Sequence, residues 1–161
     1  MLHRYVDGPV WSSAARRRCG GRVPSRAMST GLQGFDTSRL EAVIELMYLA
    51  AAADDEFSDE ERAHFKTSVE SLTDNKVSDL DALVSKIDAA LKAEGRDARL
   101  VSLKDRLPDP KMREVALQMA IRLMAVDGVV RTAERSLILE AADALEIEGD
   151  RAADMVARAG H

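Results

Sequence analysis

Cysteine is almost absent from this chain, since Cys19 is the only one among 161 residues. A disulfide within the chain is therefore excluded, and a reducing compartment is the simplest expectation. Long apolar runs are missing too, because no segment approaches the roughly 20 apolar residues that a membrane-spanning helix needs. Together these absences predict a cytoplasmic protein that does not enter a membrane.

Side chains for catalysis are scarce as well. The only histidines are His3, His64 and His161, and Cys19 lies in a segment without a helical pattern. A nucleophile with a positioned base cannot be assembled from these residues. No glycine-rich phosphate loop follows a strand, because no segment alternates apolar and polar residues for long. The sequence thus predicts a protein that is not an enzyme.

The first 34 residues differ from the rest of the chain. They hold six arginines and one aspartate, with no helical or alternating apolar period, which predicts a disordered basic leader. Two interpretations stay open: an organelle transit peptide, or a start codon assigned too far upstream, with Met28 as the true initiator. The folded domain is expected over residues 35–161, and removal of residues 1–27 should leave helicity and stability unchanged.

Charge follows the same division. The chain carries 23 basic and 28 acidic residues, so residues 35–161 keep 17 basic against 27 acidic side chains, a net charge of −10. Such a domain offers no basic stripe for phosphates, and nucleic acid is not expected as a partner. Cations and the basic surfaces of partner proteins suit it better.

Apolar residues recur at helical spacing through residues 35–161. The expected fold is all-α, a compact bundle of about seven helices joined by short connections. The predicted helices span residues of about 38–53, 59–72, 79–94, 97–107, 110–126, 132–145 and 149–159. Each is expected to bury one apolar face.

Several helix ends carry recognisable signals. Ser58 followed by Glu61, and Ser78 followed by Asp81, predict capping boxes at the second and third helices. Gly95 predicts the end of the third helix. The pair Asp109-Pro110 predicts the cap and the first residue of the fifth helix.

One phrase of the sequence occurs twice. Residues 53–62, Ala-Asp-Asp-Glu-Phe-Ser-Asp-Glu-Glu-Arg, return 73 positions later at residues 126–135 as Val-Asp-Gly-Val-Val-Arg-Thr-Ala-Glu-Arg. Each copy has an apolar residue three positions after its aligned Asp, and Glu-Arg seven and eight positions after it. Two repeated helix-turn-helix hairpins are therefore predicted. Apolar positions expected to be buried align at the same offset: Val43, Ile44 and Met47 on Ala116, Leu117 and Ala120.

The repeated turns are acidic, and residues 54–61 alone hold six carboxylates. Their spacing is not that of an EF-hand. If the hairpins bring their turns together, Asp54, Glu61, Asp127 and Glu134 would form a site of hard oxygen ligands, suited to calcium or magnesium. A structural interpretation of the same residues is also open, because a Glu in the first turn of a helix favours the helix dipole and an Asp before it can accept backbone N–H bonds.

At these residues the sequence resembles the tellurite-resistance TerB-like family, which also supplies the N-terminal domain of DjlA-type co-chaperones. The family motif is an apolar helix ending in Ala-x-x-Asp-Gly, a turn with an apolar residue, then Ser or Thr and Glu-Glu-Arg. Residues 51–62 and 124–135 are similar to it, and the resemblance covers about residues 36–160. It implies an all-helical bundle with internal repetition, a divalent-cation site at the acidic turns, and a non-enzymatic role in bacterial stress responses.

This chain departs from the family motif at three positions. Asp55 replaces the usual Gly in the first copy, and Arg131 and Ala133 stand where the second copy would carry Ser and Glu. A bound cation is therefore expected to take more ligands from the first copy. The His-Pro-Asp signature of DnaJ proteins occurs nowhere, so co-chaperone activity is not expected. The alternative function is a protein-interaction module without metal, which uses its acidic face or a groove between helices to bind a partner.

Overall fold

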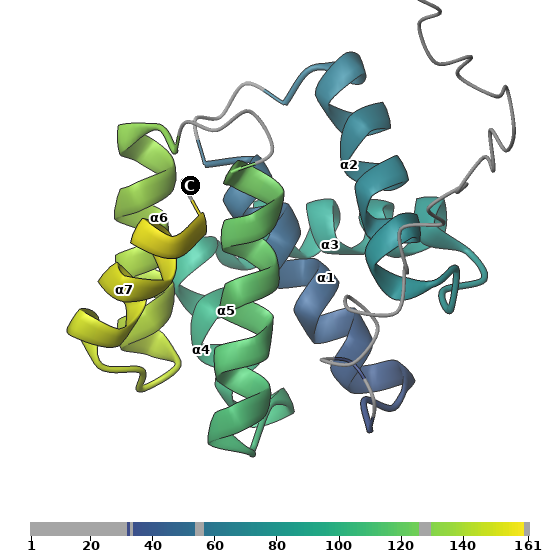
Figure 1. Cartoon of the computed structure of the whole chain (residues 1–161). Coiled ribbons are helices and arrows are strands. Elements are labelled where there is room, and N and C mark those ends of the chain that lie inside the picture. The colour runs from purple at the N-terminus through teal and green to yellow at the C-terminus, as the bar shows by residue number, and fades with distance from the viewer. Residues whose placement is uncertain (1–31, 33, 54–56, 126–129, 160–161) are drawn as a thin grey trace, which may run out of the picture.

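In a computed structural model the described part of the chain, residues 32, 34–53, 57–125 and 130–159, forms seven helices and no strand (Figure 1). The expected all-α bundle is confirmed, and each predicted helix end agrees within two residues. Val126, the expected end of the fifth helix, lies outside the described residues. The helices are α1 (Thr37–Ala51), α2 (Asp59–Thr73), α3 (Leu80–Glu94), α4 (Arg96–Arg106), α5 (Pro110–Met124), α6 (Thr132–Ala144) and α7 (Gly149–Ala159).

Capping side chains fix where several helices begin. Oδ1 of Asp36 accepts a hydrogen bond from the N–H of Arg39 at 2.9 Å, which starts α1. Oγ of Ser58 accepts one from the N–H of Glu61 at 3.2 Å, and Glu61 accepts one in return from the N–H of Ser58. This reciprocal pair confirms the predicted capping box at α2. Pro110 is the first residue of α5, after the cap that the sequence predicts.

The predicted cap of α3 is wrong. Asp79 and not Ser78 is the N-cap, because its Oδ1 accepts the N–H of the residue three positions on at 2.9 Å. Both residue types are good caps, so sequence alone does not choose between neighbours. Asp81, the expected partner of Ser78, instead forms an ion pair with Lys66 of α2. Gly95 ends α3 as predicted, with a φ of +85° that favours glycine.

Helix α1 lies in the middle of the bundle (Figure 1). It packs most extensively along α5 and also contacts α2, α3, α4 and α6, while α7 packs against α5 and α6. Because neighbours surround α1, every residue from Ala42 to Ala50 is buried. The expectation of a single apolar face was too narrow for this helix, since it omitted Leu46, Tyr48 and Leu49.

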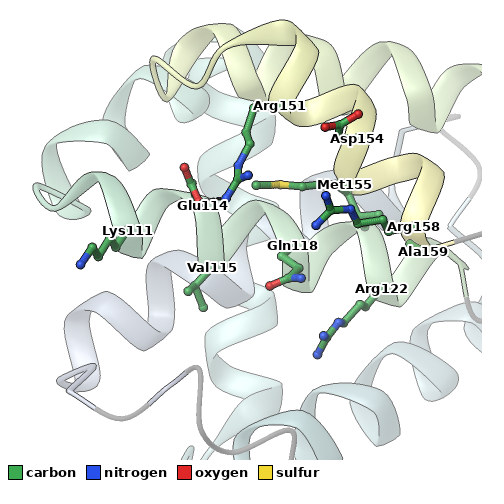
Figure 2. Close-up of a pocket in the computed structure, with 11 residues that line it drawn as sticks. Lys111, Glu114, Val115, Gln118, Arg122, Arg151, Asp154, Met155, Arg158 and Ala159 are labelled. Carbon is green, nitrogen blue, oxygen red and sulfur yellow. Dashed lines mark hydrogen bonds and ion pairs between the residues drawn. The ribbon is translucent and has the colours of Figure 1, made fainter.

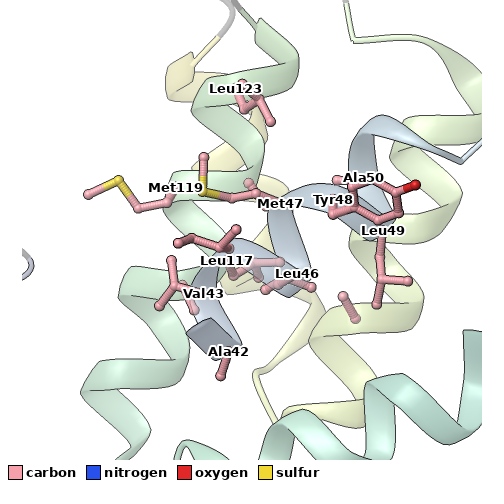
Figure 3. Packing of buried hydrophobic residues seen from close by; sticks show 14 of the residues in the cluster. Ala42, Val43, Leu46, Met47, Tyr48, Leu49, Ala50, Leu117, Met119 and Leu123 are labelled. Atoms are coloured by element: carbon pink, nitrogen blue, oxygen red, sulfur yellow. The ribbon is translucent and has the colours of Figure 1, made fainter. Parts of the chain in front are cut away.

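The apolar core joins α1 to α5. Figure 3 shows Val43 and Met47 of α1 beside Leu117 of α5. Ile44 and Leu117 have no exposed surface. All six positions predicted from the repeat to be buried are buried, with exposures from 0% to 2%. That the two hairpins are copies of one structural unit stays a prediction.

One charged side chain is buried inside this core. The Glu45 side chain on α1 is only 2% exposed, and its carboxylate lies between two arginines of α4. Nε of Arg99 donates to Oε1 of Glu45 at 2.6 Å, and Nη1 of Arg106 donates to Oε2. A buried charge is tolerated only when it is paired in this way. The interaction therefore fixes α4 against the central helix.

The described residues also show where the packed part of the chain begins. Of the predicted leader, residues 1–34, only Leu32 and Gly34 are described; Leu32 is 3% exposed and belongs to the core. Packing of the folded part thus starts at least three residues before the expected boundary at residue 35. Within the described ranges, no helix combines the length and apolar character needed to cross a membrane.

Candidate functional site

The four predicted site residues divide into two pairs. Asp54 and Asp127 lie outside the described residues. Glu61 and Glu134 are described, and each is the third residue of its helix, α2 and α6 respectively. The geometry around these two glutamates is therefore the part of the predicted site that can be followed.

Glu61 combines a structural contact with an exposed position. Its Oε2 accepts hydrogen bonds from both the backbone N–H and the hydroxyl of Ser58, each at 2.9 Å. The backbone bond, then the hydroxyl bond, hold the pKa of Glu61 below its ordinary value, and the positive charge of Arg131 acts in the same direction. Glu61 is thus ionised at neutral pH.

Glu134 has the corresponding position at α6. Its Oε2 accepts a hydrogen bond from the N–H of Arg131 at 2.6 Å. Arg131 has only donor groups in its side chain, so the reciprocal half of a capping box cannot form here. Each glutamate therefore uses one carboxylate oxygen to accept the backbone N–H of the residue that precedes its helix. Among the described residues, no hydrogen bond to Oε1 of either glutamate is formed.

The two glutamates line one pocket although they lie 73 residues apart. The pocket has a volume of about 190 Å³, and its lining combines apolar side chains with charged ones. Its described lining comes from α1, α2, α5 and α6 and from the residues directly before α2 and α6. The lining residues come from both hairpins: Ala51, Phe57, Glu61, His64 and Phe65 from the first, and Leu123, Met124, Arg131 and Glu134 from the second.

These carboxylates do not form a metal centre by themselves. Over the described residues, no three His, Cys, Asp or Glu side chains lie close enough together to hold a metal ion. A site at this pocket would therefore require ligands from residues 54–56 or 126–129.

An aromatic cluster supports the pocket from the side of the first hairpin. The rings of Tyr48, Phe57 and Phe65 meet edge to face, with centroids 5.3 to 6.0 Å apart. The guanidinium of Arg62 lies over the Phe57 ring, 5.3 Å from its centroid. The apolar residue and the Arg of the first repeated phrase thus contact each other. The cluster anchors the chain where it enters α2.

A polar chain extends from this cluster. The hydroxyl of Tyr48 donates to Oδ1 of Asp88 at 3.0 Å, and Nζ of Lys92 donates to Oδ2 at 2.6 Å. The hydrogen bond from Lys92 holds the pKa of Asp88 below its ordinary value. Burial, and then the bond to Asp88, raise the pKa of Tyr48. Sequence reasoning missed this chain because Tyr48 and Asp88 are 40 residues apart and no local pattern pairs them.

Comparison with known protein families identifies this chain's relatives. The family model described as Tellurite resistance protein TerB matches residues 40–157, which include all seven helices in whole or in part. No curated protein and no solved structure matches the chain.

Proposed function

The chain belongs to the tellurite resistance protein TerB family, and from that premise we propose that it is a non-enzymatic adaptor in a bacterial stress response. Its ligand in this proposal is a divalent cation, held where the two acidic connections approach each other. Calcium and magnesium suit the site best, because every offered ligand is a carboxylate oxygen.

The observation that carries the proposal is that Glu61 and Glu134 line the same pocket. Oε2 of each glutamate caps its own helix, and within the described part of the chain Oε1 accepts no hydrogen bond, so we propose that Oε1 contacts the cation. In the sequence, Asp54 stands three residues before Phe57 and Asp127 stands four residues before Arg131, and both of these later residues line the pocket. We propose that the carboxylates of Asp54 and Asp127 supply the ligands that the described residues lack.

The two copies of the repeated phrase make the proposed site unequal. Residues 54–61 carry six carboxylates and no basic side chain, whereas residues 127–134 carry two carboxylates and one arginine. The cation should therefore bind closer to the first connection and take most of its ligands from there.

A metal-free interaction module remains the second candidate, because both described glutamates already have a structural role as helix caps. On that alternative the acidic connections begin helices and present negative charge to a basic partner. The two candidates differ in one measurable respect, which is the response of stability to added cation.

The deciding experiment is a thermal melt with calcium, magnesium or manganese against a chelator. A cation that binds only the folded protein raises the melting temperature, and a concentration of 100 times Kd corresponds to about 2.7 kcal/mol. Asp54→Asn and Asp127→Asn should each abolish this rise. Each should also stabilise the metal-free protein slightly, because a repelling charge is removed.

Asp105→Asn is the matched control, since Asp105 is exposed on α4 and makes no ion pair within the described part of the chain. It should leave the cation response unchanged. If Asp54 and Asp127 only cap turns, their substitution should be neutral or destabilise by roughly 0.5–2 kcal/mol, with no dependence on metal. That result, or the absence of any rise in wild type, would exclude the cation site and favour the interaction module.

A further inference from the structure

A second pocket lies on another part of the molecule, between α5 and α7 (Figure 2). Its volume is about 310 Å³, and it differs from the acidic connections in the sign of its charge. Four basic side chains line it, Lys111 and Arg122 from α5 and Arg151 and Arg158 from α7, against only Glu114 and Asp154. We call it the α5–α7 groove.

Ion pairing offsets only part of the charge in this groove, because Lys111, Arg122 and Arg158 remain against one further carboxylate, that of Asp154. Nη2 of Arg151 and Oε2 of Glu114 lie 3.1 Å apart, so these two charges offset each other. Arg122 and Arg158 have no ion-pair partner within the described ranges. The groove therefore keeps a positive charge within a domain, residues 35–161, whose net charge is −10.

The two unpaired arginines belong to equivalent places on helices that run in the same direction. Arg122 lies eight residues after Glu114 on α5, and Arg158 lies seven residues after Arg151 on α7. At 1.5 Å per residue, both arginines lie roughly 10–12 Å beyond the Glu114–Arg151 pair. Figure 2 shows this order along the groove. An occupant can therefore engage both arginines without breaking the existing pair.

Apolar side chains lie between the two ends of the groove. Val115 of α5 and Met155 of α7 are half-buried and line it, and Ile121 is fully buried beneath. Methionine adapts its shape to different apolar side chains and is common at peptide-binding surfaces. The groove thus combines a small apolar floor with two guanidinium groups that can each hold a carboxylate through two hydrogen bonds.

We propose that the α5–α7 groove binds an acidic peptide segment of a partner protein, in which an apolar side chain is flanked by carboxylates. The apolar side chain covers Met155, and the carboxylates pair with Arg122 and Arg158. A nucleic acid is disfavoured because the rest of the domain repels a polyanion and because so few cations are available for its phosphates. The proposal does not depend on the cation site, because the described carboxylates there, Glu61 and Glu134, lie on α2 and α6 and do not line the groove.

The test measures the fluorescence anisotropy of a short labelled peptide in which leucine is flanked by glutamates. Wild-type protein should bind it, more weakly as salt is raised, because exposed charge pairs are screened. Arg122→Glu and Arg158→Glu should each weaken binding at least about tenfold, and the double variant should abolish it. The same peptide with glutamine in place of glutamate should not bind. Chelator should have no effect.

Lys76→Glu is the matched control, because it makes the same change in charge at an exposed position that does not line the groove. It should leave peptide binding within about twofold of wild type. Should a reversal variant fail to fold, Arg122→Gln and Arg158→Gln remove the charge without reversing it, and the same loss is expected. Circular dichroism verifies the fold of each variant.

Three results would overturn the proposal. Peptide binding that survives both arginine substitutions would show that the groove is not the site. Tighter binding of an oligonucleotide than of the peptide, lost in the same variants, would assign the groove to nucleic acid. Self-association that disappears in Arg158→Glu would make a second copy of the chain the occupant. If both arginines only favour the helix dipole from the last turn, stability should fall slightly while peptide binding persists.

Discussion

Removal of the buried carboxylate of Glu45 should destabilise the fold more than removal of any exposed charge. The Glu45 side chain is 2% exposed, and its partners Arg99 and Arg106 are 16% and 27% exposed. Breaking a fully buried ion pair typically costs about 3–5 kcal/mol, because an uncompensated charge stays in the interior. In Glu45→Ala the arginines remain within reach of water, so the lower end applies. The expected loss is about 3 kcal/mol.

Urea unfolding monitored by circular dichroism gives the assay, because urea leaves charge interactions unscreened by salt. The midpoint should fall while the slope stays the same. Glu41→Ala is the control: Glu41 lies one turn earlier on α1, is half-buried, and forms no ion pair within the described residues. This control should cost about 0.5 kcal/mol or less.

A combined variant separates attraction within the ion pair from the cost of an unpaired charge. Glu45→Met with Arg99→Met and Arg106→Met replaces the whole cluster by apolar side chains. Such replacement is often neutral, so most of the lost stability should return. If the free energies of unfolding of Glu45→Ala and Glu41→Ala differ by less than about 1 kcal/mol, the buried ion pair does not hold α4 against α1, and the reasoning fails.

Three further predictions concern packing, pH and a connection between helices. Ile44 and Leu117 have no exposed surface, so Ile44→Ala and Leu117→Ala should each lower the free energy of unfolding in urea by roughly 2–5 kcal/mol. Near-zero losses at both positions would contradict the assignment of the core. The raised pKa of Tyr48 contributes stability that is present below the ordinary tyrosine pKa of about 10 and is lost as pH rises through the folded value. Melts from pH 8 to 11 should therefore show a weaker alkaline loss in Tyr48→Phe than in wild type; parallel curves would rule this out. Arg113 donates to the carbonyl oxygens of Leu107 and Leu145 at 2.7 and 3.3 Å. Lysine cannot reach both oxygens, so Arg113→Lys should lower the free energy of unfolding in urea by roughly 1–3 kcal/mol. An unchanged urea midpoint would show that these two hydrogen bonds are dispensable.

Local signals in the sequence predicted the helices well. The signals that marked helix ends act within a few residues of their own position, so the local sequence alone identifies them. They are Ser58 with Glu61, Gly95 and Pro110. The error at Ser78 has the same origin, because its neighbour Asp79 is an equally good cap and no local signal chooses between them.

Tertiary pairing could not be predicted in the same way. In the sequence Glu45 resembles a solvated helix residue, because its partner Arg99 lies 54 positions later and no local pattern pairs the two. At the candidate site, Glu61 and Glu134 line one pocket, and their role as cation ligands stays a prediction because Asp54 and Asp127 lie outside the described residues. The basic groove between α5 and α7 escaped notice, because its charges come from two helices of a strongly acidic domain.

The central position of α1 sets the order in which the chain can fold during synthesis. This helix ends at Ala51, and its most extensive neighbour, α5, begins only at Pro110. Contacts between such distant segments slow folding, since the intervening chain must be closed into a loop before they form. At roughly 5–20 residues per second, the ribosome releases α1 several seconds before the helix that covers it. The most apolar surface of the domain is thus the earliest to emerge, and a nascent chain halted before α5 leaves that surface open to chaperones or to aggregation.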